Sequence, residues 1–95
     1  MTDFRDVVSD NRFEQGFATP EGEEGIVWAD YATQGDRRVI LHVEAEPHLR
    51  GTGASGRFMQ ALADHARTEG IKLTPRCGYA VAWFKRHREY EDLLA

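Results

Sequence analysis

A glycine-rich stretch flanked by arginines gives the clearest chemical signal in this chain. It reads His48-Leu49-Arg50-Gly51-Thr52-Gly53-Ala54-Ser55-Gly56-Arg57, after an apolar run typical of a strand and before a run typical of a helix. Glycines let the backbone approach a phosphate closely, and the first N–H groups of a helix have no partner within the helix. This order of elements predicts a site for a bound phosphate group.

One cysteine and one acid–histidine pair could also take part in chemistry. Cys77 follows Arg76 and precedes a predicted helix, and both features favour the thiolate form of a cysteine. Cys77 is therefore either a reactive thiol or a small buried residue, which is the common fate of a free cysteine. Glu44 and His42 are two residues apart in a predicted strand, so they share one of its faces. They form either a proton relay or a solvated acid beside a hydrogen-bonded histidine.

Length and composition limit the classes of protein to consider. The 95 residues fit one small domain, with 41% hydrophobic and 29% charged residues. A formal net charge of −4 argues against general nucleic-acid binding. No apolar run reaches the ~20 residues that span a bilayer, and the first residues do not resemble a signal peptide, so we expect a cytoplasmic protein. The single cysteine and the spacing of the histidines predict no metal site.

The elements that would position these groups follow the order β-β-β-α-β-α. Residues 1–10 are expected to form a loose arm. Alternation, turn signals and helical spacing predict strands over Arg12–Phe17, Gly25–Thr33, Arg38–Ala45 and Ile71–Pro75, and helices from Gly53 or Ala54 to Glu69 and over Tyr79–His87. In the third strand, a period of two places Val39, Leu41, Val43 and Ala45 on one face and Ile40, His42 and Glu44 on the other.

Two blocks of residues resemble a known superfamily. The pattern Arg50-x-x-Gly53-x-Ser55 resembles the acetyl-CoA pyrophosphate motif of the GNAT N-acetyltransferases, in which the last position is Gly or Ala. The block Thr74-Pro75-Arg76-Cys77-Gly78-Tyr79, with the later His87-Arg88-Glu89-Tyr90, resembles the small single-domain GNAT-like subfamily. Gly78 and Arg88 stand where that subfamily tends to have Pro, and Val43 replaces a common Thr. The resemblance runs from about Phe13 to Leu94 and implies a compact α/β fold with a mixed sheet and two splayed central strands.

The resemblance also implies acetyl-CoA as a cosubstrate. Its acetyl-pantetheine arm would lie between the strands ending near Ala45 and Cys77, and would pair with the backbone of Val43, Glu44 and Ala45. Its pyrophosphate would lie on the loop formed by Arg50, Gly51, Thr52, Gly53, Ala54 and Ser55. This placement agrees with the preference of ligands for the carboxyl ends of parallel strands.

The catalytic roles that the resemblance implies stay open between alternatives. Glu44 is the candidate base, with His42 as a second candidate. Cys77 is a nucleophile that takes the acetyl group, a hydrogen-bond partner of the leaving sulfur, or a structural residue. Phe84 occupies the position at which many GNAT enzymes have an acidic tyrosine, and it has no proton to transfer.

Two classes of function therefore compete. The first is an N-acetyltransferase that acts on an unidentified amine, and the second is a non-catalytic CoA or acyl-CoA binding module or interaction domain. The segment Phe17–Gly25 is too short for the helices with which larger GNAT enzymes build an acceptor site. We therefore expect an open acceptor groove that suits a small amine, or a lysine or N-terminal amine of a protein.

Overall fold

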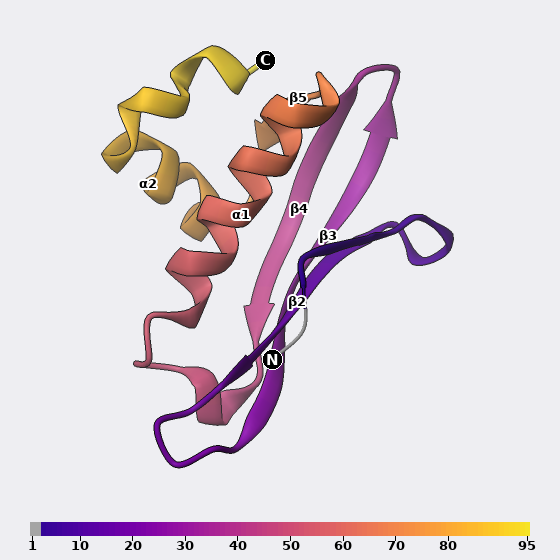
Figure 1. Cartoon of the computed structure of the whole chain (residues 1–95). Coiled ribbons are helices and arrows are strands. Elements are labelled where there is room, and N and C mark those ends of the chain that lie inside the picture. The colour runs from indigo at the N-terminus through magenta and orange to yellow at the C-terminus, as the bar shows by residue number, and fades with distance from the viewer. Residues whose placement is uncertain (1–2) are drawn as a thin grey trace.

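The computed structural model describes residues 3–95 and contains one five-stranded mixed sheet in the order β1-β2-β3-β4-β5. The strands are β1 (Arg5–Val7), β2 (Arg12–Ala18), β3 (Glu24–Gln34), β4 (Arg37–Ala45) and β5 (Lys72–Pro75). β1 to β4 pair antiparallel, and β5 lies parallel to β4. A parallel neighbour requires a crossover, which helix α1 (Ala54–Glu69) supplies (Figure 1). Helix α2 (Gly78–Arg86) and the 3₁₀ segment η3 (Arg88–Leu93) complete the chain. The expected fold class is confirmed.

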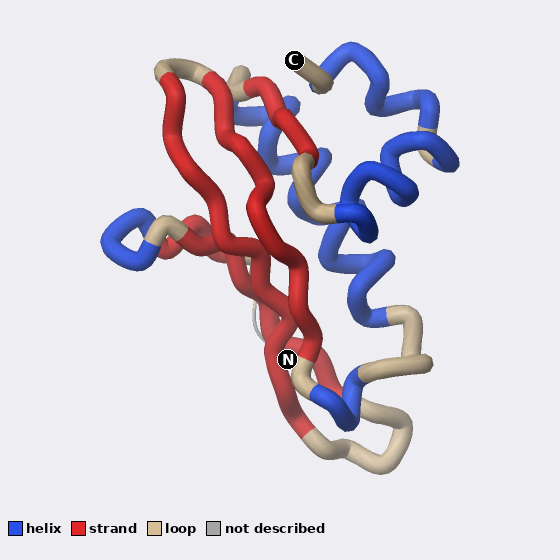
Figure 2. The backbone as a smooth tube through the Cα atoms, turned by 180° about the vertical axis from the view of Figure 1, so that it is seen from behind, coloured by secondary structure: helices blue, strands red, loops and turns tan. Residues whose placement is uncertain are grey.

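The hydrophobic core lies between one face of the sheet and the helices. Alternate residues of β2 and β3 point into it, as a half-buried strand requires. They meet a stripe on α1 that repeats at helical spacing, and α2 closes the same core from the side. Its members include Phe13, Phe17, Val27, Ala29, Ile40, Phe58, Leu62, Ala66, Ala80 and Trp83. Viewed from behind, no helix of the described residues lies across the other face of the sheet (Figure 2).

A β-bulge in β4 overturns part of the expected facing of that strand. His42 pairs with Asp30, but Ile40 pairs with Tyr31, so Leu41 has no residue opposite it. The extra residue shifts the alternation, with the result that Ile40 is fully buried and Leu41 is 51% exposed. The prediction that Leu41 shares a face with Val43 and Ala45 was therefore wrong, as was the grouping of Ile40 with His42 and Glu44. A strict period of two does not reveal a bulge.

The expected loose arm was also wrong for the residues that the structure describes. Arg5–Val7 form β1 and pair with β2. Phe4 stacks on Phe13, with ring centroids 5.6 Å apart. The Tyr31 hydroxyl donates a hydrogen bond to Asp6 at 2.6 Å. These contacts fix the arm to the sheet, while η1 (Val8–Asp10) forms the turn between β1 and β2.

The expected helices are confirmed and place the candidate site between them. Gly70 ends α1 in the left-handed conformation with φ 70°, as its position predicts. Cys77 precedes the first residue of α2. His87 follows the last residue of α2, and its Nδ1 lies 2.8 Å from the carbonyl oxygen of Trp83. Trp83 and Phe84 are buried in the core.

Candidate active site

The two central strands separate at the point where β5 ends. Their pairing stops at Ile40 and Pro75, and the amides of Arg76 and Cys77 then both donate to the Ile40 carbonyl. β4 continues to Ala45, and no strand of the described part of the chain pairs with it on that side beyond Ile40. The expected splay is thus present. It leaves one backbone edge of β4, which includes Val43, Glu44 and Ala45, available to an extended ligand.

The glycine turn presents several backbone donors without partners. Gly51 and Gly53 have φ values of 80° and 86°, which a residue with a Cβ rarely adopts. The short 3₁₀ segment η2 (Pro47–Leu49) turns the chain into this loop, and α1 begins at Ala54. Among the hydrogen bonds of residues 3–95, none is donated by the N–H groups of Gly51, Gly53, Ser55 and Gly56. Convergent free N–H groups at a helix start form a cradle for an anion.

A groove of about 730 Å³ adjoins this cradle and lies between α1 and α2. On the α1 side it is lined by Gly53, Gly56, Arg57 and Gln60, and on the α2 side by Tyr79, Trp83, Arg86 and His87. The two arginines supply positive charge, and the aromatic rings supply flat apolar surface. This composition suits a ligand that combines phosphates with an apolar or aromatic part.

Arg86 and Tyr79 were not among the sequence-predicted site residues. Tyr79 is 38% exposed at the rim of the groove. Burial raises the pKa of its phenol, the nearby Cys77 adds to this effect, and Arg86 opposes it. The helical period from Trp83 would have placed Arg86 on the same side of α2, but only the position of α1 shows that this side faces the glycine turn.

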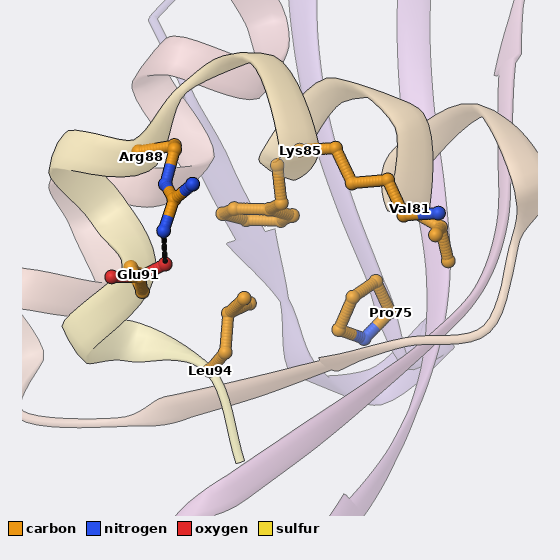
Figure 3. Close-up of a pocket in the computed structure, with 7 residues that line it drawn as sticks. Pro75, Val81, Lys85, Arg88, Glu91 and Leu94 are labelled. Atoms are coloured by element: carbon orange, nitrogen blue, oxygen red, sulfur yellow. Dashed lines mark hydrogen bonds and ion pairs between the residues drawn. The ribbon is translucent and has the colours of Figure 1, made fainter.

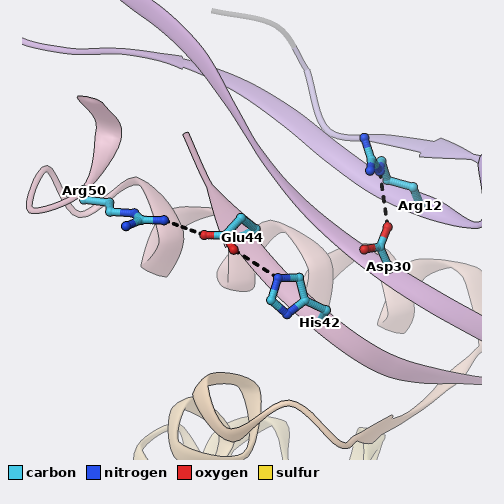
Figure 4. A network of polar contacts seen from close by, with 5 residues as sticks. All are labelled: Arg12, Asp30, His42, Glu44 and Arg50. Atoms are coloured by element: carbon cyan, nitrogen blue, oxygen red, sulfur yellow. Dashed lines mark hydrogen bonds and ion pairs between the residues drawn. The ribbon is translucent and has the colours of Figure 1, made fainter. Parts of the chain in front are cut away.

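The acid–histidine pair predicted from the sequence is confirmed as a contact and gains a third member. His42 Nε2 lies 3.1 Å from Glu44 Oε2, and Arg50 Nη2 donates to Glu44 Oε1 at 2.7 Å (Figure 4). These two hydrogen bonds, with that of His42 contributing most, lower the pKa of the Glu44 carboxyl. The side chain of Arg50 therefore lies on the candidate base, although the sequence placed it with the phosphate-binding loop.

The cluster lies on the sheet face that no helix covers. Cross-strand pairing sets Glu14, Trp28 and Glu44 in one row and Arg12, Asp30 and His42 in the next. Directly opposed residues share a face of the sheet. Arg12 lies 3.3 Å from Asp30 and covers the Trp28 ring at 5.0 Å. The candidate base thus belongs to an open, mixed-charge surface, which Figure 4 shows together with the Arg12–Asp30 pair.

Cys77 occupies the boundary between the splay and α2. It is half-buried, packs against the core, and is the residue before the first turn of α2, whose amides have no side-chain cap. Its amide contact with Ile40 places it at the start of the separated region of β4. Among the interactions of residues 3–95, no hydrogen bond or ion pair joins Cys77 to the cluster of His42, Glu44 and Arg50. The structure therefore separates the sequence-predicted residues into the glycine turn, the acid–histidine cluster and Cys77.

A second cavity lies on the opposite side of α2. Its volume is about 280 Å³, and it is lined by Pro75, Val81, Phe84, Lys85, Arg88, Glu91 and Leu94 (Figure 3). Arg88 is paired with Glu91 at 3.1 Å. Phe84, which stands at the tyrosine position of the GNAT pattern, lines this cavity and not the groove beside the glycine turn.

The remaining histidines have structural contacts. The His65 ring packs against the rings of Phe4 and Phe13. His48 Nε2 lies 2.7 Å from the carbonyl oxygen of Glu24. Within residues 3–95, no group of three His, Cys, Asp or Glu side chains is arranged to hold a metal ion, and no helix is long and apolar enough to span a membrane.

Comparison with known proteins gives the family. Residues 14–93 match the model of the GCN5-related N-acetyltransferase family. The chain belongs to this family. The resemblance read from Arg50-x-x-Gly53-x-Ser55 and the Cys77 block is therefore confirmed.

One solved structure with the same fold is a GCN5-like N-acetyltransferase candidate from Staphylococcus aureus, determined in solution by NMR. It superposes with a TM-score of 0.62 at 19% identity, over 98% of this chain and 87% of that one. At this identity the likeness establishes the fold alone. A search of curated protein sequences gives no match. Membership of the family thus rests on the family model and the fold, and the substrate must be inferred from the site.

Proposed function

We propose that this GCN5-related domain binds acetyl-CoA and transfers its acetyl group to an amine. The observation that carries the proposal is the set of free N–H groups at Gly51, Gly53, Ser55 and Gly56, which opens onto the groove lined by Arg57 and Arg86. Phosphates suit such donors because they bear charge and accept several hydrogen bonds. The residues present therefore fit the phosphate groups of the cosubstrate.

The separated edge of β4 supports the second half of the site. A pantetheine arm carries amides, and amides pair with free strand backbone as another strand would. The edge at Val43, Glu44 and Ala45 begins where Cys77 and Ile40 diverge. We expect the thioester to lie toward this end, because Cys77 is the thiol in the subfamily motif and stands at the opening.

The reaction needs a base, a polarised carbonyl and a leaving thiolate. In direct transfer, the amine nitrogen bonds to the acetyl carbon, the carbon–sulfur bond breaks, and the amine proton ends on the released thiol. Glu44 is the group that takes this proton first, with His42 beside it. In the two-step route, Cys77 Sγ takes the acetyl group and gives its proton to the departing CoA, after which the amine attacks the new thioester.

The acceptor approaches from the uncovered face of the sheet. The chain between β2 and β3 is a tight turn, in which Gly22 N donates to Thr19 O at 2.9 Å and Thr19 N to Glu23 O at 2.8 Å. No helix is inserted there, so no helix of the described residues 3–95 covers the surface around His42 and Glu44. This arrangement favours an exposed lysine or N-terminal amine of a protein, or an unselective small amine.

Mass spectrometry and thiol release together test the proposal. The protein is incubated with acetyl-CoA, searched for an acetyl adduct on Cys77, and assayed for free CoA with peptide and small-amine acceptors. Release that persists in Cys77→Ala establishes direct transfer, and an adduct that decays when amine is added establishes the two-step route. Absence of both acetyl-CoA binding and thiol release would refute the proposal.

One observation favours a second function, a CoA or acyl-CoA binding module. Phe84 carries no transferable proton at the position where many GNAT enzymes have a tyrosine, and its ring is 4% exposed. In that case acetyl-CoA binds, no adduct forms, and no amine accelerates thiol release.

A further inference from the structure

We propose that Arg50 is a positioning residue that holds the Glu44 carboxylate in the free protein and leaves it for a phosphate when the cosubstrate binds. The inference rests on the proposed function and adds a link between its two halves, the anion cradle and the base. The link is the ion pair between Arg50 Nη2 and Glu44 Oε1 at 2.7 Å. Its two partners come from different parts of the site, the loop before α1 and the strand β4.

Arg50 is placed to interact with both the anion cradle and the candidate base Glu44. Its Cα directly precedes Gly51, whose N–H is the first free donor of the cradle. Within residues 3–95, its side chain makes no hydrogen bond, ion pair or ring contact other than the ion pair with Glu44. An anion held by the amides of Gly51 and Gly53 would therefore lie next to the backbone of Arg50, while the guanidinium is held elsewhere by one carboxylate oxygen.

The strength of the two competing interactions favours release. The Arg50 side chain is 62% exposed and that of Glu44 33%. An exposed ion pair of this kind contributes little, because water and salt screen its charges. The two phosphates of a pyrophosphate together carry two negative charges, whereas the Glu44 carboxylate carries one, and their oxygens can accept two parallel hydrogen bonds from a guanidinium. Phosphates bound by the backbone amides are thus expected to replace the Glu44 carboxylate as the partner of the Arg50 guanidinium.

When the Arg50 guanidinium leaves, a few charged or polar groups remain near the Glu44 carboxylate. His42 remains at 3.1 Å on the same strand. Across the sheet, Glu14 is paired with Arg5, and Asp30 with Arg12. Glu46 accepts a hydrogen bond from the amide of Ile26. No second arginine contacts the Glu44 carboxylate among these neighbours.

Release changes the proton affinity of Glu44 in a known direction. The hydrogen bonds of His42 and Arg50 lower the pKa of the carboxyl, so removal of Arg50 raises it toward its ordinary value. Oε1 also becomes free to accept a proton from an incoming amine. Both changes make Glu44 a better base once the cosubstrate is present, and a poorer one when it is absent.

The test is an NMR titration of the Glu44 carboxyl carbon, with and without CoA. The amides of Gly51 and Gly53 report binding independently, and the amide spectrum confirms the folded state at each pH. We expect CoA to raise the titration midpoint of Glu44 in the wild type. Arg50→Gln should show the raised midpoint without ligand and no further change with CoA.

Arg57→Gln is the matched control. Arg57 belongs to the same loop–helix junction, but its guanidinium contacts the Thr52 carbonyl and the Phe17 ring and not Glu44. It should leave the Glu44 titration of the free protein unchanged. If CoA shifts the Gly51 and Gly53 amides while the Glu44 midpoint stays fixed, the positioning role of Arg50 is refuted and the proposed function stands. If those amides do not respond, the proposed cosubstrate site fails, and the role of Arg50 fails with it.

Discussion

The substitution Gly56→Leu should change folding stability and cosubstrate binding in opposite directions. A Cβ at Gly56 meets no heavy atom within 4 Å, and Gly56 is not among the residues with positive φ. It lies in the first turn of α1 and lines the groove beside the glycine turn. The Cβ therefore has room, and we expect the rest of the leucine side chain to extend into the groove.

We expect Gly56→Leu to raise the free energy of unfolding and to lower the affinity for acetyl-CoA. Glycine within a helix costs about 1 kcal/mol relative to the best helix formers, and in a first turn we expect roughly half of that to be regained with leucine. A gain of about 0.5 kcal/mol raises the Tm of a domain of this size by about 2–4 °C. The side chain would keep a phosphate from the free N–H groups of Gly53 and Gly56. Loss of one hydrogen bond to a charged group costs about 1.5–3 kcal/mol, so the affinity for acetyl-CoA should fall at least about tenfold.

Thermal unfolding without ligand and calorimetric titration with acetyl-CoA measure the two effects. Thr68→Leu is the matched control, because it introduces the same side chain at an exposed position near the other end of α1. It should leave acetyl-CoA binding unchanged. An unchanged affinity in Gly56→Leu, together with the expected rise in Tm, would show that the cosubstrate does not use this groove.

Three further predictions concern the elements around the site. Burial and the hydrogen bond to Asp6 raise the pKa of Tyr31 from 10.0 to about 12, so its contribution to stability should be intact below pH 10.0 and lost as the pH rises toward 12. Tyr31→Phe should lower the free energy of unfolding by about 1–2 kcal/mol near neutral pH and remove this alkaline component, as pH-dependent denaturant unfolding would reveal. Gly25→Ala places a Cβ 2.5 Å from His48 Nε2 and should lower the free energy of unfolding by about 1 kcal/mol, because His48 loses its contact with the Glu24 carbonyl oxygen. In a His48→Ala background the same substitution should cost little. Equal costs in both backgrounds would contradict this reason. Cys77→Ser should cap α2 and raise its stability by about 0.5 kcal/mol, while no acetyl adduct forms; a drop in Tm would mean that packing outweighs capping.

The elements with long-range periodicity could be predicted from sequence. Helix α1 shows its inward stripe at helical spacing and its end at Gly70, and both were found where the pattern placed them. The shared face of His42 and Glu44 was correct because both residues lie on the same side of the bulge. The faces of Ile40 and Leu41 could not be predicted, because a bulge depends on pairing with β3 and leaves no signal in β4 alone.

The short and irregular elements carried too little information. β1 has three residues, too few for alternation to be visible, and it is held by Phe4 and Asp6 through contacts with residues far along the chain. The contact of Arg50 with Glu44 depends on how η2 turns the chain back toward β4, which is a matter of tertiary geometry. Family resemblance supplied the candidate phosphate-binding loop, but neither resemblance nor periodicity indicated that its arginine contacts the candidate base.

The open face of the sheet bears on the role that we propose for the contact between Arg50 and Glu44. Many enzymes couple cosubstrate binding to catalysis by closing a loop or lid over the site. In residues 3–95 no helix or long loop is placed to cover His42 and Glu44, so exclusion of solvent cannot provide the coupling. An arginine that moves from base to phosphate provides it without any movement of the backbone. If Arg50 acts in this way, Arg50→Gln should lose the dependence of Glu44 on cosubstrate while the open surface, and hence access of the acceptor, stays the same.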